Sequence, residues 1–159
     1  MKILIVCDTY EGLATELSLF MKNEAVKMNR RVTILDAHDT NHRPGEFDAI
    51  VIVGEVRNKE LKDSLIDFIR TNLSAMNLTP SFFIPLLPCE DENNLSVPES
   101  FRNSIRELLL KLQWAPQQVL ALPVGIRLQL NEFITLTDWD ALKISLQRFM
   151  VRNDVVMVG

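Results

Sequence analysis

The sequence predicts a single α/β domain in which a doubly wound, five-stranded parallel sheet carries helices on both faces. Short apolar segments alternate along the chain with longer stretches whose apolar residues recur at helical spacing. Strands that alternate with helices form crossover units, and such units build a parallel sheet. No linker or internal repeat divides the 159 residues, so residues 1–159 are expected to form one domain.

The first half of the chain contains three predicted strands and two predicted helices. Each strand is short, apolar and bounded by turn-forming residues, which is typical of a buried strand. The predicted strands are KILIVC (2–7), RRVTILD (30–36) and AIVIVG (49–54), and the predicted helices run from Gly12 to Met28 and from Leu61 to Leu73.

The second half continues the alternation. The predicted elements are a strand SFFIPLL (81–87), a helix from Phe101 to Leu112, a strand QVLALPVGI (118–126) with EFITL (132–136) as a candidate continuation, and a last helix from 137 to 150. Pro85 lacks an amide hydrogen, so it predicts a kink within its strand. Thr137 is expected to cap the last helix, with Asp140 three residues later, as in a capping box.

Composition and charge exclude several classes of protein. The net charge of −4 and pI near 5.2 argue against non-specific nucleic-acid binding, which requires a basic face. No apolar run approaches the ~18–20 residues of a membrane span, and Asp8 interrupts the apolar start too early for a signal peptide. A cytoplasmic protein is therefore expected. Cys7 and Cys89 fall at predicted strand ends. Two cysteines do not form a secreted disulfide framework, so buried or half-buried thiols are expected.

Four segments resemble a known family. They are ILIVCDTYEG at the start, IVIVGEVRNKEL after the third strand, LQWAP before the fifth, and TDWDAL at the last helix. Together they resemble the flavodoxin fold, and more narrowly the oxygen-independent, flavodoxin-like protoporphyrinogen dehydrogenases of bacterial haem synthesis. The resemblance covers almost the whole chain. It implies the strand order 2-1-3-4-5, FMN as cofactor, and electron transfer or oxidoreduction.

The carboxyl ends of the strands are the expected ligand site, because open α/β sheets bind ligands where the strand order reverses. CDTYEGLAT (7–15) stands where flavodoxin-type loops hold phosphate in a T-x-x-G-x-T frame. Thr9 and Gly12 fit that frame, whereas Ala14 takes the last position and Thr15 is displaced by one. Asp8 precedes the frame, and its negative charge is expected to weaken phosphate binding at this loop by about 1 kcal/mol or more.

The resemblance implies one set of residues around the phosphate and another beside the flavin ring. The first set is Thr9, Tyr10, Glu11, Gly12, Leu13 and Ala14; the second is Glu55, Val56, Arg57, Asn58, Leu87, Pro88 and Cys89. The ring-flanking segments contain no Phe, Tyr or Trp, and Asn58 stands where the family has an aromatic residue. Arg57 is expected to stack on the ring instead. No catalytic residue or metal ligand is implied.

Two functions follow from these features. The first is FMN-dependent electron transfer or oxidoreduction. The alternative is a degenerate flavodoxin-like domain that binds no FMN and acts as a protein-interaction or regulatory module. A porphyrinogen dehydrogenase is least favoured, because GIRLQLNEFITLTDW lacks the long basic, aromatic insertion that the family carries before its last helix.

Two polar clusters allow further interpretations. Asp8, Glu11, Glu55 and the CEDEN segment (89–93) would gather at one edge of the sheet. They form either an acidic rim that steers a basic redox or regulatory partner or a solvated surface. DAHDTNH (36–42) places two histidines and two aspartates within seven residues. A surface loop is favoured there over a metal site, which usually draws ligands from several elements.

Overall fold

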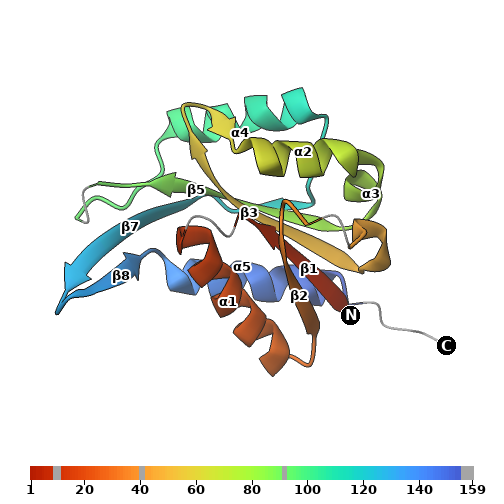
Figure 1. Ribbon diagram of the computed structural model, residues 1–159, viewed down its shortest axis with the longest axis horizontal. Coiled ribbons are helices and arrows are strands. Elements are labelled where there is room, and N and C mark those ends of the chain that lie inside the picture. Colours follow the sequence, from red (N-terminus) through yellow and green to blue (C-terminus); the bar gives the residue numbers. More distant parts are fainter. Residues whose placement is uncertain (9–11, 40–41, 91–92, 155–159) are drawn as a thin grey trace.

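A computed structural model describes residues 1–8, 12–39, 42–90 and 93–154. A sheet forms the central layer, and helices cover both of its faces (Figure 1). The strands are β1 (Lys2–Cys7), β2 (Arg31–Asp36), β3 (Ala49–Arg57), β4 (Glu60–Leu61), β5 (Ser81–Pro88), β6 (Gln118–Val119), β7 (Leu122–Gln129) and β8 (Glu132–Leu136). The helices are α1 (Gly12–Lys27), the short 3-10 helix η1 (Pro44–Glu46), α2 (Asp63–Thr71), α3 (Leu73–Leu78), α4 (Glu99–Leu112) and α5 (Trp139–Arg152).

The strand order along the sheet is β2-β1-β3-β5-β7-β8. Its parallel part, β2-β1-β3-β5-β7, confirms the predicted order 2-1-3-4-5, with β5 and β7 as the fourth and fifth predicted strands. The expectation of a purely parallel, five-stranded sheet is wrong in one respect. Two short hairpins add antiparallel strands, because β4 turns back on β3 and β8 turns back on β7.

β3 continues three residues beyond Gly54, where the sequence analysis ended it. A Cβ atom at Gly54 would lie 2.4 Å from Cδ1 of Leu65, so glycine allows α2 to pack closely on the strand at this point. The strand therefore passes under the start of α2 and carries Glu55 and Arg57 out to the carboxyl edge of the sheet.

Pro85 lies inside β5 at a level where the neighbouring strand is interrupted. Phe82 and Phe83 pair with β6, and pairing with β7 begins only at Leu86. The gap between β6 and β7 thus lies beside Pro85. A proline is tolerated best at such a place, because its missing amide hydrogen removes no hydrogen bond to a neighbouring strand there.

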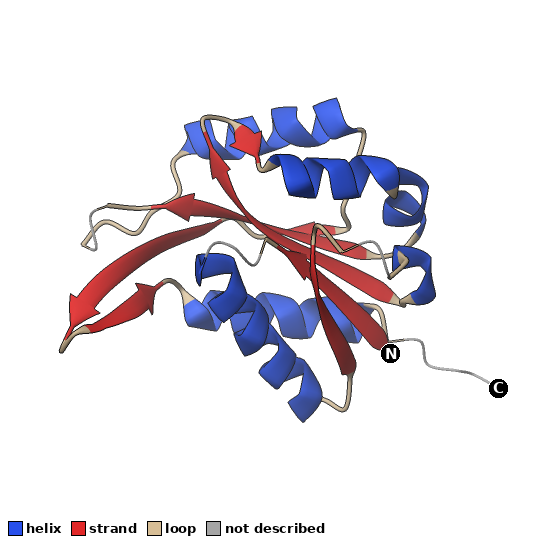
Figure 2. Ribbon diagram, in the orientation of Figure 1, coloured by secondary structure: helices blue, strands red, loops and turns tan. Residues whose placement is uncertain are grey.

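Helices lie on both faces of the sheet (Figure 2), and an apolar core lies beneath the helices on each face. Successive strand residues point to opposite faces, so Phe82 joins the core under α1 and α5, whereas Phe83 joins the core under α2 and α4. The ring of Phe82 packs on Phe149 at 5.4 Å between centroids, and Phe83 packs on Trp114 at 5.1 Å. The first of these cores contains a second aromatic pair, because Phe20 and Trp139 pack at its margin at 4.9 Å between centroids.

Two helix predictions need correction. The helix predicted from Leu61 to Leu73 is shorter: Leu61 lies in β4, and α2 runs only from Asp63 to Thr71. It ends at Asn72, whose side-chain amide donates to the Phe68 carbonyl at 2.9 Å, and a separate helix, α3, follows. The N-cap of α5 is Asp138, not Thr137: its carboxylate accepts from the Ala141 amide at 2.9 Å. Thr137 is engaged elsewhere, since its hydroxyl donates to the Pro123 carbonyl at 2.8 Å.

Cys7 and Cys89 are both free thiols, the first buried and the second half-buried. Burial raises the pKa of the Cys7 thiol, so this group stays protonated at neutral pH. In the part of the chain that the structure describes, no helix is both long enough and apolar enough to cross a membrane.

Candidate functional site

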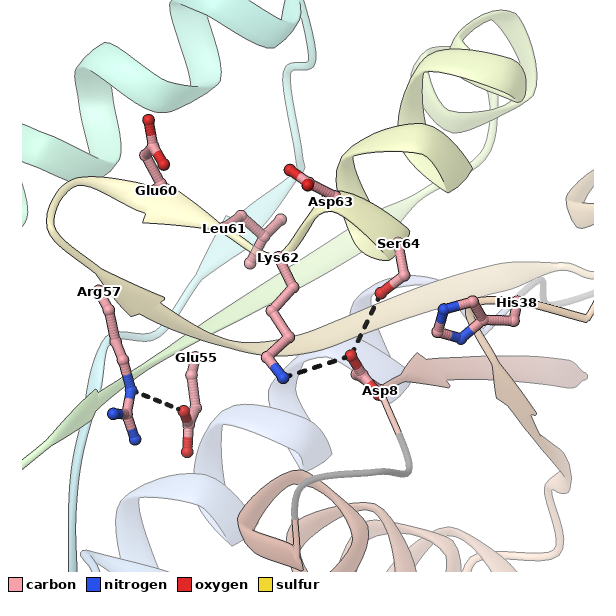
Figure 3. Close-up of a pocket in the computed structure, with 9 residues that line it drawn as sticks. All are labelled: Asp8, His38, Glu55, Arg57, Glu60, Leu61, Lys62, Asp63 and Ser64. Carbon is pink, nitrogen blue, oxygen red and sulfur yellow. Dashed lines mark hydrogen bonds and ion pairs between the residues drawn. The ribbon is translucent and has the colours of Figure 1, made fainter.

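Two clefts meet at the carboxyl edge of the sheet and share Glu55 and Arg57. The first, here named the α1-side cleft, has a volume of about 500 Å³ and is lined by Leu13, Glu16, Glu55, Arg57, Ile126, Phe133 and Thr135. The second, the α2-side cleft (Figure 3), has a volume of about 460 Å³ and is lined by Asp8, His38, Glu55, Arg57, Glu60, Leu61, Lys62, Asp63 and Ser64.

Asp8 belongs to the α2-side cleft because of the alternation along β1. Val6 lies in the core on the α2 side, Cys7 lies in the core on the α1 side, and Asp8 returns to the α2 side. Its carboxylate accepts from the Ser64 hydroxyl at 3.2 Å and forms an ion pair with Lys62 at 3.7 Å (Figure 3). Asp8 is only 6% exposed, so these contacts offset the cost of burying its charge.

Glu55 and Arg57 follow Val51 and Val53 along β3 and share their face, the one that carries α1. The Arg57 guanidinium donates from Nε to the Glu55 carboxylate at 3.1 Å, and Glu55 is 6% exposed. Val56 points the other way and packs in the core beneath α2. Of the residues expected beside a flavin ring, Glu55 and Arg57 therefore reach the α1-side cleft.

The segment after β3 is a tight hairpin rather than an open loop. Asn58 and Lys59 have φ angles of 52° and 64°, and two positive φ values at the centre of a two-residue hairpin are typical of a type I′ turn. Asparagine is one of the residues that adopt this conformation most readily, so the turn accounts for Asn58. Asn58 is not among the residues that line either cleft.

The end of β5 is fastened to the neighbouring strand. Leu87, Pro88 and Cys89 are half-buried, and the Cys89 amide donates to the Val124 carbonyl at 2.8 Å. Gly125 faces this segment: a Cβ there would lie 3.3 Å from Leu95 and 3.5 Å from the Cys89 carbonyl oxygen. The residues predicted at this second ring-flanking segment thus pack against β7.

The first turn of α1 contributes to the α1-side cleft. Leu13 lines the cleft, and Ala14 is buried in the core below it. The hydroxyl oxygen of Thr15 is buried without a hydrogen-bond partner among the described residues. Buried hydroxyls normally find a partner, so this one is a candidate ligand-binding group. Thr9, Tyr10 and Glu11 lie outside the described residues, and Gly12 is the first residue of α1.

The sequence analysis missed the third wall of the α1-side cleft. Ile126, Phe133 and Thr135 reach it from the β7–β8 hairpin, and the Thr135 hydroxyl donates to the Glu16 carboxylate of α1. The alternation of apolar and polar residues in GIRLQLNEFITL is the signal that could have revealed two paired strands. Phe133 lies in neither of the two segments that the resemblance places beside the flavin ring.

The two polar clusters differ in their surroundings. In the proposed acidic rim, Asp8 contacts Lys62 and Glu55 contacts Arg57, whereas Glu90 is exposed. A partner at this rim stays a prediction. In the 36–42 segment, Nδ1 of His38 lies 2.9 Å from the Asp36 carboxylate. Within the described ranges, no group of three or more His, Cys, Asp or Glu residues is placed to hold a metal ion.

The chain is similar to known flavodoxin-type proteins in sequence. A family model described as "Flavodoxin domain" matches residues 4–133. Protoporphyrinogen IX dehydrogenase [quinone] of Escherichia coli K12 is 22% identical over 130 residues, which cover 80% of this chain and 70% of that protein.

Solved structures of flavodoxins have a similar fold. A flavodoxin from the domain Archaea superposes with a TM-score of 0.62 at 14% identity and covers 97% of this chain and 99% of its own. Oxidised flavodoxin 1 from Bacillus cereus superposes with a TM-score of 0.56 at 13% identity over the full length of both chains. At these identities the likeness concerns the fold, which is therefore flavodoxin-like.

Proposed function

The chain belongs to the flavodoxin domain family, and on that premise we propose that it binds FMN at the α1-side cleft and takes part in electron transfer. FMN supplies the redox chemistry when it is bound, and the protein supplies binding, orientation and electrostatics. The proposal requires an anion site for the phosphate, a cleft for the ring, and a charge distribution that tolerates both.

The observation that carries the proposal is the buried, unpartnered hydroxyl of Thr15 at the start of α1. The first backbone amides of a helix have no partner within the helix, and the positive end of the dipole of this 16-residue helix lies at the same terminus, so a phosphate binds favourably there. Thr15 stands one position after the last hydroxyl of the flavodoxin frame. A phosphate oxygen would give the hydroxyl the acceptor that the described residues do not provide.

The position of Asp8 removes the main electrostatic objection to a phosphate at this terminus. Its carboxylate lies on the face of the sheet opposite α1, where Lys62 and Ser64 contact it. Its position on the other face of the sheet and the nearby ammonium group of Lys62 both reduce its repulsion of an anion on the α1 face. The expected weakening of the phosphate loop by Asp8 is therefore small.

Electron transfer is a better match than oxidation of a porphyrinogen. Glu16 and Glu55 both line the α1-side cleft, so a substrate with propionate groups would meet carboxylates there. The oxidised isoalloxazine ring is uncharged and meets no such penalty. The distant dehydrogenase relative supports the family, and we propose no porphyrinogen substrate for this chain.

The test is an absorption spectrum of the purified protein followed by titration with FMN and with riboflavin, which lacks the phosphate. We expect saturable FMN binding in the micromolar range, and riboflavin binding at least tenfold weaker because the phosphate contacts are missing. Thr15→Val should weaken FMN binding and leave riboflavin binding unchanged. Thr33→Val, the same change in the edge strand β2, is the matched control and should alter neither.

Each result bears on a different part of the proposal. No binding of FMN at millimolar concentration would overturn it and favour a flavin-free interaction or regulatory module. Equal affinities for FMN and riboflavin would overturn the phosphate site at α1. An unchanged FMN affinity in Thr15→Val would remove the role of the orphan hydroxyl.

A further inference from the structure

We propose that the β7–β8 hairpin is the apolar wall of the flavin site and that Phe133 is the aromatic side chain that packs on the isoalloxazine ring. The inference rests on the FMN binding proposed above and adds a binding element outside the two segments where the sequence placed the ring.

The register of the hairpin decides which side chains share a face. Residues directly opposite each other in an antiparallel pair point to the same side of the sheet. Ile126 is opposite Thr135 and Leu128 is opposite Phe133, so these four side chains lie on one face. Three of the four, all but Leu128, line the α1-side cleft. The face is therefore turned toward α1 and the end of β3.

This face is apolar and uncovered. Ile126, Leu128 and Phe133 are 53%, 63% and 78% exposed, although side chains of this size are usually buried. The opposite face is mainly polar by the same register: it carries Arg127, Gln129 and Glu132, with Ile134 as an apolar member. A contiguous apolar patch beside a cleft marks a binding surface.

The other walls of the cleft fit a flat, uncharged ring attached to an anion. Leu13 and the Glu55–Arg57 pair lie across from the hairpin, and the volume of about 500 Å³ suits a cofactor-sized ligand. Thr15 lies in the first turn of α1 with Leu13 but does not line the cleft, so the proposed phosphate site is at the amino end of the helix, beside the cleft. Among the described residues that line the cleft, Phe133 is the aromatic one, and aromatic rings stack favourably on one another.

The base of the hairpin is held in place on both sides. The Thr135 hydroxyl donates to the Glu16 carboxylate of α1, and Gly125 allows Leu95 to approach the strand closely. Phe133 lies only two residues beyond the Thr135 contact, so its position relative to α1 is set by this bond.

The experiment compares Phe133→Ala and Phe133→Leu with Ile134→Ala. Ile134 is the next residue on the same strand, is 38% exposed and points to the opposite face, which makes it a matched control. Affinities for FMN and riboflavin are measured by flavin fluorescence, and the fluorescence remaining at saturation reports stacking. Circular dichroism checks that each variant is folded, and Phe133→Leu retains the apolar bulk if the alanine variant is unstable.

We expect Phe133→Ala to weaken FMN and riboflavin binding alike, by about tenfold, and to raise the fluorescence of the bound flavin. Ile134→Ala should match the wild type. Wild-type FMN affinity and fluorescence in both Phe133 variants would overturn the inference while leaving FMN binding intact. No FMN binding by the wild type would overturn both. An effect on FMN alone would also contradict it, because the ring is common to both ligands.

Discussion

The carboxylate of Asp8 is buried on one face of β1, while the thiol of Cys7 is buried on the other. This single step along the strand separates an acidic side chain from the helix terminus that it precedes in sequence. Ser64 and Lys62 reach it from the start of α2. The residue therefore serves to join β1 to α2 and does not face the anion site proposed at α1.

Asp8→Asn tests this separation at the level of a single side chain. The amide retains the shape of the carboxylate but loses the charge-assisted contacts, so the free energy of unfolding should fall by about 1–2 kcal/mol. FMN affinity should change by less than about twofold, because the charge lies across the sheet. Urea unfolding and the FMN titration measure the two effects.

Asp48→Asn provides the control, since Asp48 is exposed and accepts from the Lys2 amide at 2.7 Å. Its unfolding free energy should change by less than about 0.5 kcal/mol. A large gain in FMN affinity on Asp8→Asn would contradict the assignment of Asp8 to the α2 side.

The face on which Asp8 lies could have been predicted from the sequence by counting in twos from the buried residues of KILIVC. Its partners could not, because Ser64 is 56 residues away and no local pattern links the two. The same limit applies to Thr135 and Glu16, which are 119 residues apart. The spacing of residues predicts on which side of a strand or helix a residue lies, whereas the tertiary fold determines which residues it contacts there.

The two hairpins are the elements that the sequence analysis did not foresee. Type I′ turns are usually signalled by Asn-Gly or Asp-Gly, and here they are formed by Asn58–Lys59 and Leu130–Asn131. Neither turn contains a glycine, so the sequence predicts a strand that stops at Gly54 and gives EFITL (132–136) as a continuation of the preceding strand. The five long parallel strands carried clear apolar runs and were predicted in the correct order.

Lys59→Gly tests the strain in the β3–β4 turn. Lys59 is exposed and has a φ of 64°, a left-handed conformation that glycine adopts without the steric cost of a Cβ atom. The variant should be more stable by about 0.5–1 kcal/mol, measured by urea unfolding. Glu60→Gly, the adjacent exposed position, has no positive φ and should be destabilised by a similar amount. Equal destabilisation of both variants would show that Lys59 carries no strain.

The sheet divides into a covered part and a projecting part. β1, β3 and β5 lie between helices on both faces, and their side chains fill both cores. The β7–β8 hairpin extends beyond the helices at one end of the molecule (Figure 1). Its base is held to α1 by the Thr135–Glu16 bond, and its outer residues are exposed, Leu130 by 90%. The family resemblance predicted the covered part and gave no indication of the projecting one.

Amide hydrogen exchange should reveal this division and its response to FMN. In the free protein, amides of β1, β3 and β5 should exchange most slowly and those at the outer end of the β7–β8 hairpin fastest, because few contacts oppose local opening there. At a free FMN concentration of 100 times the dissociation constant, bound ligand adds about 2.7 kcal/mol to any opening that breaks the site. Exchange of the hairpin amides near Ile126 and Phe133 should then slow by up to about a hundredfold, since 1.4 kcal/mol is a factor of ten.

Helix α3 is the control: it lines neither cleft, so the rate of its local amide exchange should stay unchanged when FMN binds. Slowing confined to α1, with no change in the hairpin, would mean that the cofactor is held by its phosphate alone and that the projecting wall does not close on the ring.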